Sequence, residues 1–291
     1  MLKTLKRFLI SIGLLLLLLA LIIVSSAIIC NFAITTNEYE VTIDGLNTSV
    51  RIVCIADLHG KEFGEGNRRL ISKIEVQEPD AIFVVGDMVG PDATVEEAER
   101  FIELVSALQE IAPVFVSNGN HEQEYIEETG ENLFDRIADL GVTVVDDSFV
   151  DVELAGNTLR IGGTLGYLCG YGLAEGESSP LLDMMDDFND TDLPKILLAH
   201  MPFSALLGSG YTDWDIDLVV SGHTHGGLIR IPFVGGLYAP PWEEWWPTYD
   251  MGYFELEDDT KMVITSGLSG YKYVPRIFNL PEVCVIALIP S

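Results

Sequence analysis

The stretch DAIFVVGD, residues 80–87, is a short run of apolar residues that ends in glycine and aspartate. A run without polar alternation predicts a strand that is covered on both faces, as in the centre of an α/β sheet. The stretches SVRIVCIAD (residues 49–57) and APVFVSNGNH (residues 112–121) have the same form. Between these stretches the sequence predicts helices over residues 67–77 and 94–111. The first half of the chain is therefore expected to alternate strands and helices around one sheet.

Capping signals place the ends of two predicted helices. Thr94 is the expected N-cap residue of the helix over residues 94–111, and Glu97 completes a capping box. A third helix is expected from Gln123 to Leu140, ended by Gly141.

The second half of the chain predicts strands and hairpins. Two of its strands end in histidine, within residues 194–202 and 215–227. Strands with a hairpin at 155–157 are expected inside residues 142–164, a second hairpin at Asp258-Asp259, and a closing strand over residues 282–289. In the first half, an opening strand is expected over residues 37–43.

Composition excludes some classes of function. The chain of 291 residues has a formal net charge of -29, and residues 1–50 carry equal numbers of basic and acidic residues. The acidic excess therefore falls on residues 51–291, which argues against nucleic acid as a partner. None of the four cysteines has CxxC spacing, which argues against a cysteine metal site.

The N-terminus predicts a membrane anchor. Phe8 to Ile29 is a run of 22 residues without a charge, and as a helix it would span roughly 33 Å, about one hydrocarbon core. The alternative is a signal peptide cleaved after Ser25-Ser26-Ala27. Because Lys3, Lys6 and Arg7 precede the run, we expect a single-pass protein of the cell membrane with its large domain outside the cytoplasm. We expect residues 1–35 to form the anchor and linker, and residues 36–291 one domain.

Polar side chains follow each of the expected central strands. They are Asp57, His59, Asp87, Asn120, His121, His200, His223 and His225. Since ligands gather at the carboxyl ends of strands in α/β sheets, these side chains are expected to converge. Carboxylates, imidazoles and one amide suit divalent Mn, Fe or Zn. The number of candidate ligands, without His121, is too large for one tetrahedral ion and suits two ions that share a carboxylate.

Each piece of this pattern is weak by itself. An Asp-x-His or Gly-Asp sequence after a strand is also an ordinary turn, whereas Gly-His-Thr-His-Gly (residues 222–226) rarely serves packing. The interpretation as a metal site rests on all these motifs occurring together in this order.

The series D-x-H, G-D, G-N-H-E, H and G-H-x-H resembles the calcineurin-like metallophosphoesterase superfamily over about residues 50–230. The GHTHGG stretch with a preceding anchor, and the tail YKYVPRIFNLPEV (residues 271–283), look like its bacterial membrane-associated branch. That branch includes phosphodiesterases and enzymes that cleave the diphosphate of UDP-diacylglucosamine. The resemblance implies an α/β fold (α+β in some schemes), a four-layer β-sandwich flanked by helices.

The resemblance also implies roles for the residues. One metal would be held by Asp57, His59, Asp87 and His225, and the second by Asp87, Asn120, His200 and His223. His121 would act as a general acid or stabilise charge beside the scissile bond. The nucleophile would be a hydroxide that bridges the two metals.

Two positions depart from the family pattern. Gly90 stands where the family often has an aspartate that orients the catalytic histidine, so Asp92 or Glu122 is the expected partner of His121. Leu228 stands where glutamine often follows the glycine pair. Neither change removes a ligand.

These observations predict a membrane-anchored two-metal phosphoesterase that acts on a phosphodiester or diphosphate, of a small molecule or linked to lipid. The alternatives are a phosphomonoester or protein phosphatase on the same scaffold and a catalytically inactive binding module. The sequence does not indicate the oligomeric state.

Arg276, Trp245 and Trp246 are the expected substrate-binding residues. Both tryptophans belong to the insert YAPPWEEWWPTYD (residues 238–250), where the spacing of Trp242, Trp245 and Trp246 would place the three rings on one face of a helical turn. We expect this insert to lie beside the site and to touch lipid or a lipid-like substrate, because tryptophans favour membrane–water interfaces. The alternative is that the rings pack as a small core beneath the loop.

Overall fold

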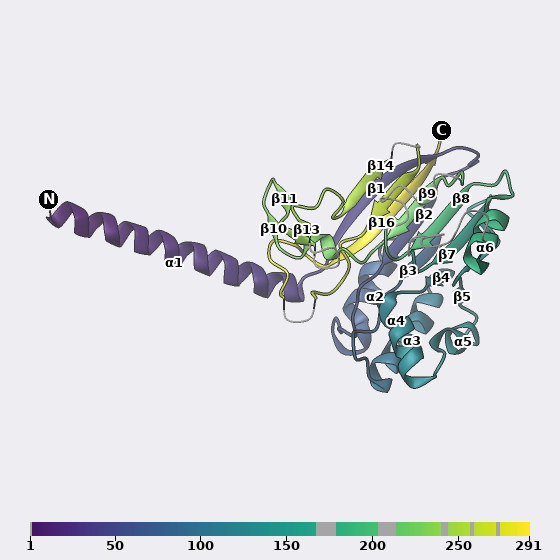
Figure 1. Cartoon of the computed structure of the whole chain (residues 1–291), viewed down its shortest axis with the longest axis horizontal. Helices are drawn as coiled ribbons and strands as arrows, with labels where there is room; N and C mark the ends of the chain where they lie inside the picture. The colour runs from purple at the N-terminus through teal and green to yellow at the C-terminus, as the bar shows by residue number, and fades with distance from the viewer. Residues whose placement is uncertain (1, 167–178, 203–213, 240–243, 257–258, 272–273) are drawn as a thin grey trace.

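The structure is a computed structural model of the chain that describes residues 2–166, 179–202, 214–239, 244–256, 259–271 and 274–291. Two six-stranded sheets pack face to face, and helices cover the outer face of each sheet, which gives four layers (Figure 1). The predicted α/β fold, a β-sandwich flanked by helices, is confirmed.

The first sheet contains the strands predicted in the first half of the chain. Its strands are, in spatial order, β1 (Thr35–Ile43), β16 (Glu282–Pro290), β2 (Val50–Ile55), β3 (Ala81–Val85), β4 (Val114–Ser117) and β5 (Thr143–Val144). Strands β2 to β5 run parallel, and β16 is antiparallel to β2. Its outer face is covered by α2 (Arg68–Glu75), α3 (Val95–Gln109), α4 (Asn120–Thr129) and α5 (Leu133–Ala138).

The second sheet comes mainly from the second half of the chain. Its strands are, in spatial order, β14 (Gly252–Glu255), β15 (Lys261–Ile264), β9 (Leu218–Ser221), β8 (Lys195–Ala199), β7 (Asn157–Thr164) and β6 (Ser148–Leu154). Its outer face packs against α6 (Pro180–Asn189). Both predicted hairpins pair as antiparallel strands, β6 with β7 and β14 with β15, although Asp258 itself lies outside the described residues.

The apolar strands of the first sheet are buried on both faces. Val53 and Ile55 of β2 pack with the helices, whereas Ile52 and Cys54 of the same strand pack between the two sheets. Because successive side chains of a strand point to opposite faces, a strand between two layers needs apolar residues at every position. This explains the unbroken runs in the sequence.

The helix predictions are partly right. Thr94 caps α3, because its Oγ1 accepts a hydrogen bond from the N–H of Glu97 at 3.3 Å. The single helix expected from Gln123 to Leu140 is wrong. Two helices, α4 and α5, occupy this stretch, and Gly130 with a φ of 71° ends α4. The α4 helix also begins earlier than expected, at Asn120.

The N-terminal helix α1 (Leu2–Phe32) extends away from the body of the protein (Figure 1). It is long and apolar enough to cross a membrane. It ends three residues before β1 begins at Thr35. Two of its side chains, Ser26 and Cys30, are buried, and both lie in its last two turns.

Short segments follow the second sheet's β9 strand. They are the 3-10 turn η3 (His225–Gly227), the pair β10 (Arg230–Ile231) and β11 (Gly235–Gly236), and the pair β12 (Tyr238–Ala239) and β13 (Glu244–Trp245); a further 3-10 turn, η1 (Glu65–Asn67), precedes α2. The helical turn expected for the tryptophans is therefore wrong at Trp245, which pairs with Tyr238 across two strands. The rings of these two residues lie 5.1 Å apart, a stabilising cross-strand aromatic contact. Trp242 lies outside the described residues.

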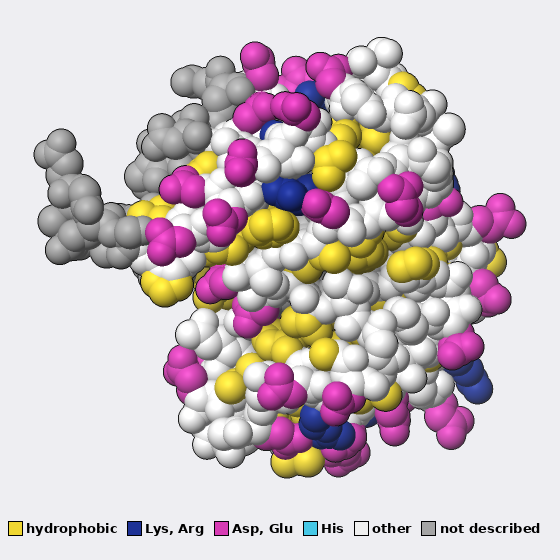
Figure 2. Space-filling model, turned by 90° about the vertical axis from the view of Figure 1, so that its right-hand side faces the viewer, with side chains coloured by type: hydrophobic (Ala, Val, Ile, Leu, Met, Phe, Trp, Pro, Cys, Tyr) yellow, Lys and Arg dark blue, Asp and Glu magenta, His cyan; other side chains and the backbone are white. Residues whose placement is uncertain are grey.

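The surface reflects the acidic composition. On the face shown in Figure 2, acidic side chains are spread over the surface and basic side chains are few. This distribution agrees with the argument against a polyphosphate partner.

Candidate metal centre

The histidines and carboxylates selected from the sequence meet where the strands of the two sheets end. Asp57 and His59 follow β2, Asp87 follows β3, and α4 begins with Asn120 and His121 shortly after β4. From the second sheet, His200 follows β8, and His223 and His225 follow β9.

One group of ligand atoms comes from Asp57, His59 and His225, which lie within 4.8 Å of one another. The Nε2 atoms of His59 and His225 each lie 3.9 Å from Oδ1 of Asp57. This group contains three of the four residues expected around the first metal.

A second group comes from Asp87, His200 and His223, within the same 4.8 Å. Oδ2 of Asp87 lies 3.2 Å from Nε2 of His200 and 3.9 Å from Nε2 of His59. Asp87 therefore belongs to the second group and also lies near His59 of the first, as a carboxylate shared by two cations would.

Two buried atoms of the candidate ligands have no hydrogen-bond partner among the residues that the structure describes. They are Nε2 of His59 and Oδ1 of Asn120. A buried polar atom without a partner is costly and needs an explanation. Because both atoms are good ligands for a divalent transition metal, the donor set fits a metal centre.

The protonation of the imidazoles also suits metal binding. Burial lowers the pKa of His223 to about 3 and that of His225 to about 4, so both rings are neutral near pH 7. Burial lowers the pKa of His200, but the nearby carboxylate of Asp87 raises it more, and the net pKa is about 10. A cation at Nε2 of His200 would therefore replace a proton. Burial raises the pKa of Asp57, but His225 and the other site histidines outweigh burial and hold it at about 2.

Contacts on the far side of two rings fix their orientation. Nδ1 of His200 lies 2.7 Å from the carbonyl oxygen of Val85, and Nδ1 of His225 lies 3.3 Å from that of Ser269. Hydrogen bonds of this kind select the tautomer and aim the other nitrogen at the metal. In both rings, Nε2 is the atom left for the centre.

The loops that carry the ligands have unusual backbone conformations. Five ligand residues have positive φ, between 47° and 69°: Asp57, His59, Asp87, His223 and His225. Such conformations cost free energy in residues other than glycine and are typical of functional sites. The carboxylate of Glu122 holds one of these loops, because it accepts hydrogen bonds from the N–H groups of Asp87, Met88 and Val89 at 2.7–3.0 Å.

Gly119 is required by close packing against Asp87. A Cβ atom at this position would lie 2.2 Å from the main-chain nitrogen of Asp87 and 2.5 Å from its Oδ1. The glycine therefore allows α4 to approach the end of β3, and the N–H of His121 donates to Oδ1 of Asp87 at 3.0 Å.

His121 is oriented by a residue that the sequence analysis did not identify. Its Nδ1 lies 2.7 Å from Oε2 of Glu124, and its Nε2 lies 3.7 Å from Oδ2 of Asp87. Both expected partners are wrong: Glu122 binds the backbone of residues 87–89, and the exposed Asp92 has no such contact with His121. A helix that starts at Asn120 places Glu124 three residues after His121 on the same face, so a correct helix start would have revealed the pair.

Arg276 has a structural role in place of the expected contact with substrate. It is 3% exposed, and its guanidinium donates to the carbonyl oxygens of Ser266, Ser269 and Asn279. Asn279 in turn donates from Nδ2 to the carbonyl oxygen of His225 at 2.8 Å. These residues hold the loop behind His225, and the guanidinium is fully used by protein acceptors.

Trp245 and Trp246 are on the surface. They are 65% and 54% exposed. The alternative that these two rings form a buried satellite core is therefore wrong.

Clustered histidines and carboxylates at the strand ends of a four-layer sandwich fit the class of metallophosphoesterases. The chain belongs to the calcineurin-like phosphoesterase family, whose model matches residues 50–227.

The relatives agree with this assignment. The chain is 29% identical to the uncharacterized metallophosphoesterase Cj0846 of Campylobacter jejuni, over 93% of this chain and 69% of that protein. It is also 29% identical to the phosphodiesterase YaeI of Escherichia coli, over 82% of each chain. A transmembrane protein with metallophosphoesterase domain from Danio rerio is 26% identical, over 86% of this chain and 56% of that protein. The family and the clustered ligands support a phosphoric ester hydrolase that binds divalent metal.

Proposed function

We propose that the protein is a membrane-anchored phosphoesterase that binds two divalent metals, Mn, Fe or Zn, and hydrolyses a phosphodiester or diphosphate of a small molecule or a lipid. The observation that carries this proposal is that Asp87, a member of one ligand group, also lies near a histidine of the other. One group is Asp57, His59 and His225, the other is Asp87, His200 and His223, and Asp87 also forms a group with His59 and His121. Similarity to a protein named a phosphodiesterase supports the diester over a monoester.

The residues of this chain supply the remaining chemistry. Two bound cations would lower the pKa of a water molecule and offset the charge on the phosphoryl oxygens. Nδ1 of His121 donates its N–H to the carboxylate of Glu124, and Nε2 is the ring nitrogen that faces Asp87. As an oxygen of water bonds to phosphorus and the bond to the leaving oxygen breaks, His121 in its imidazolium form would give the proton on Nε2 to that oxygen and keep its Nδ1–H on Glu124. The proton released by the water would then restore the imidazolium.

The substrate class is tested by hydrolysis with the purified full chain and Mn. Three substrates separate the alternatives: bis-p-nitrophenyl phosphate, p-nitrophenyl phosphate and a nucleotide-diphosphate lipid. The proposal predicts faster turnover of the diester or the diphosphate lipid. Turnover of the monoester alone would favour a phosphatase, and no turnover of any of them would favour a binding module.

We also propose that α1 is retained as an anchor and that the catalytic domain lies outside the cytoplasm. Cleavage after Ala27 would remove Ser26, whose Oγ accepts a hydrogen bond from the N–H of Phe278 at 2.7 Å. The positive charges before the apolar run support the orientation. A reporter that is active only outside the cytoplasm, fused after Ser291, should be active. Digestion of the C-terminal domain by a cytoplasmic protease in intact cells would contradict this orientation.

A further inference from the structure

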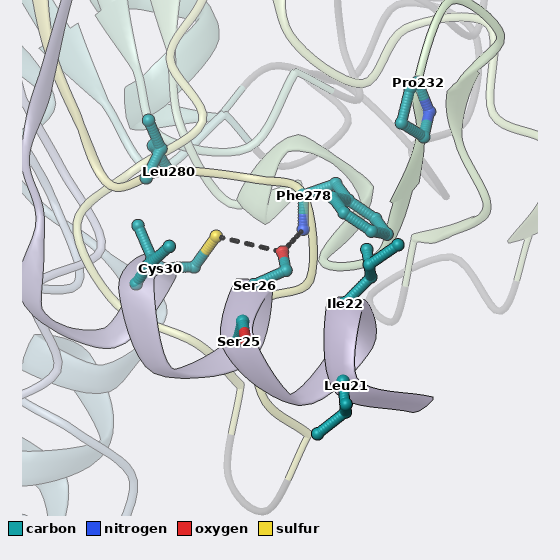
Figure 3. A pocket seen from close by; sticks show the side chains of 9 residues that line it. Leu21, Ile22, Ser25, Ser26, Cys30, Pro232, Phe278 and Leu280 are labelled. Atoms are coloured by element: carbon teal, nitrogen blue, oxygen red, sulfur yellow. Dashed lines mark hydrogen bonds between the residues drawn. The ribbon is translucent and has the colours of Figure 1, made fainter. Parts of the chain in front are cut away.

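The catalytic domain contacts α1 before the helix ends. Besides the hydrogen bond from Phe278 to Ser26, the side chain of Cys30 is only 3% exposed. Figure 3 shows the segment around Phe278 lying against the last turns of the helix. The domain therefore lies alongside the final third of the apolar run, not beyond it.

A cavity of about 640 Å³ lies at this contact. Its helical wall includes Leu21, Ile22 and Ile29, and its domain wall consists of Pro232, Phe278 and Leu280 (Figure 3). Its hydroxyl groups are those of Ser25 and Ser26, and the latter is already engaged by Phe278. An apolar ligand is the kind that such walls accommodate.

The position of the cavity along α1 places it within the membrane. Apart from Cys30, its helical wall lies in the last nine residues of the run from Phe8 to Ile29, which fills about one hydrocarbon core. The turn beside Pro232 agrees with this depth, because Phe233 is fully exposed and Val234 is 65% exposed. Apolar side chains at such a tip are stabilised in the boundary between headgroups and acyl chains.

We propose that this cavity binds one acyl chain of a membrane lipid. The proposal rests on the proposed membrane anchoring of α1. The alternative occupant is a second helix, which is about 10 Å wide. The acyl chain is thinner and is supplied by the surrounding bilayer.

The bound chain touches the segment that supports the metal centre. Phe278 and Leu280 form its wall, and Asn279 between them donates to the carbonyl oxygen of the metal-ligand candidate His225 at 2.8 Å. An occupied cavity therefore packs the loop behind His225 from the membrane side.

Photochemical labelling of the full chain tests this site. The protein is placed in phosphatidylcholine nanodiscs that contain phosphatidylcholine with a diazirine in its acyl chain, and the labelled residues are mapped by mass spectrometry. We expect label on Phe278 and Leu280 in addition to α1. The Ser25→Trp variant fills the cavity and should lose most of the label on these two residues. The matched variant Ile23→Trp, at an exposed position that does not line the cavity, should keep it.

The outcomes are distinguishable. Label on α1 without label on Phe278 and Leu280 would overturn the lipid site and leave the anchor intact. The lipid site would also be overturned if both tryptophan variants kept the label on Phe278 and Leu280. The absence of label on α1 would overturn the membrane anchoring and the lipid site together. This outcome does not bear on the hydrolysis of phosphodiesters, which is measured in a separate experiment.

Discussion

Nδ1 of His121 lies 2.7 Å from the carboxylate of Glu124, one turn further along α4. The other nitrogen of the ring faces Asp87. Glu124 therefore fixes the ring, and in the proposed mechanism Nε2 acts on the leaving group.

The His121→Ala variant should keep its metals and lose roughly 10²–10⁴ in rate, the usual contribution of a general acid. The loss should be smaller for p-nitrophenol than for an alkoxide, because a good leaving group needs less protonation. Rates with both leaving groups and metal analysis of the same sample check this. If the variant loses one metal, His121 is a ligand, as its closeness to His59 and Asp87 also allows.

The Glu124→Gln variant should lose roughly 10–100-fold in rate, because the ring is no longer held. In the His121→Ala background the same substitution should have no further effect, which a double-mutant cycle measures. The matched control is Glu127→Gln on the exposed side of α4, which should retain full activity. Additive losses in the double variant would show that Glu124 acts independently of His121.

The Gly119→Ala variant should lose activity and about 1–3 kcal/mol of stability through overpacking against Asp87. Gly90→Ala provides the control, since its Cβ would meet only ordinary contacts at 3.5 Å from the carbonyl oxygen of His59. Chemical denaturation and hydrolysis rates compare the two variants. Equal stability of the two would contradict the close approach at Gly119.

Replacing Trp245 and Trp246 with serine should cost at most about 1 kcal/mol of stability, because both rings are exposed and only the cross-strand contact of Trp245 with Tyr238 is lost. We expect selective loss of activity on a lipid-linked substrate and normal activity on a soluble diester. Thermal melting and the two rates are measured together. An equal loss on both substrates would argue against contact between these rings and lipid.

Much of the fold follows from local signals. The unbroken apolar run over residues 81–85 predicts a strand between two layers, and the end of each such run locates a polar side chain of the centre. These arguments need only the periodicity of a strand and the position of its carboxyl end.

Contacts that depend on the course of loops, near or distant in sequence, could not be predicted. Arg276 was expected at the substrate, but the acceptors that surround it come from a loop whose course depends on the complete fold. Glu122 likewise binds three N–H groups that are 33–35 residues away. The break at Gly130 was missed because apolar spacing continues through it, although glycine is the residue most typical of a helix end.

Metal content tests the central claim most directly. The full chain, purified and loaded with Mn, should contain two metals per chain and hydrolyse bis-p-nitrophenyl phosphate, and chelation should abolish this activity. The Asp87→Asn variant should lose metal and activity together while its circular dichroism is unchanged, because a charge shared by two dications is removed. The exposed Asp92→Asn control should behave like the wild type. Two retained metals and normal turnover in Asp87→Asn would contradict the proposed centre.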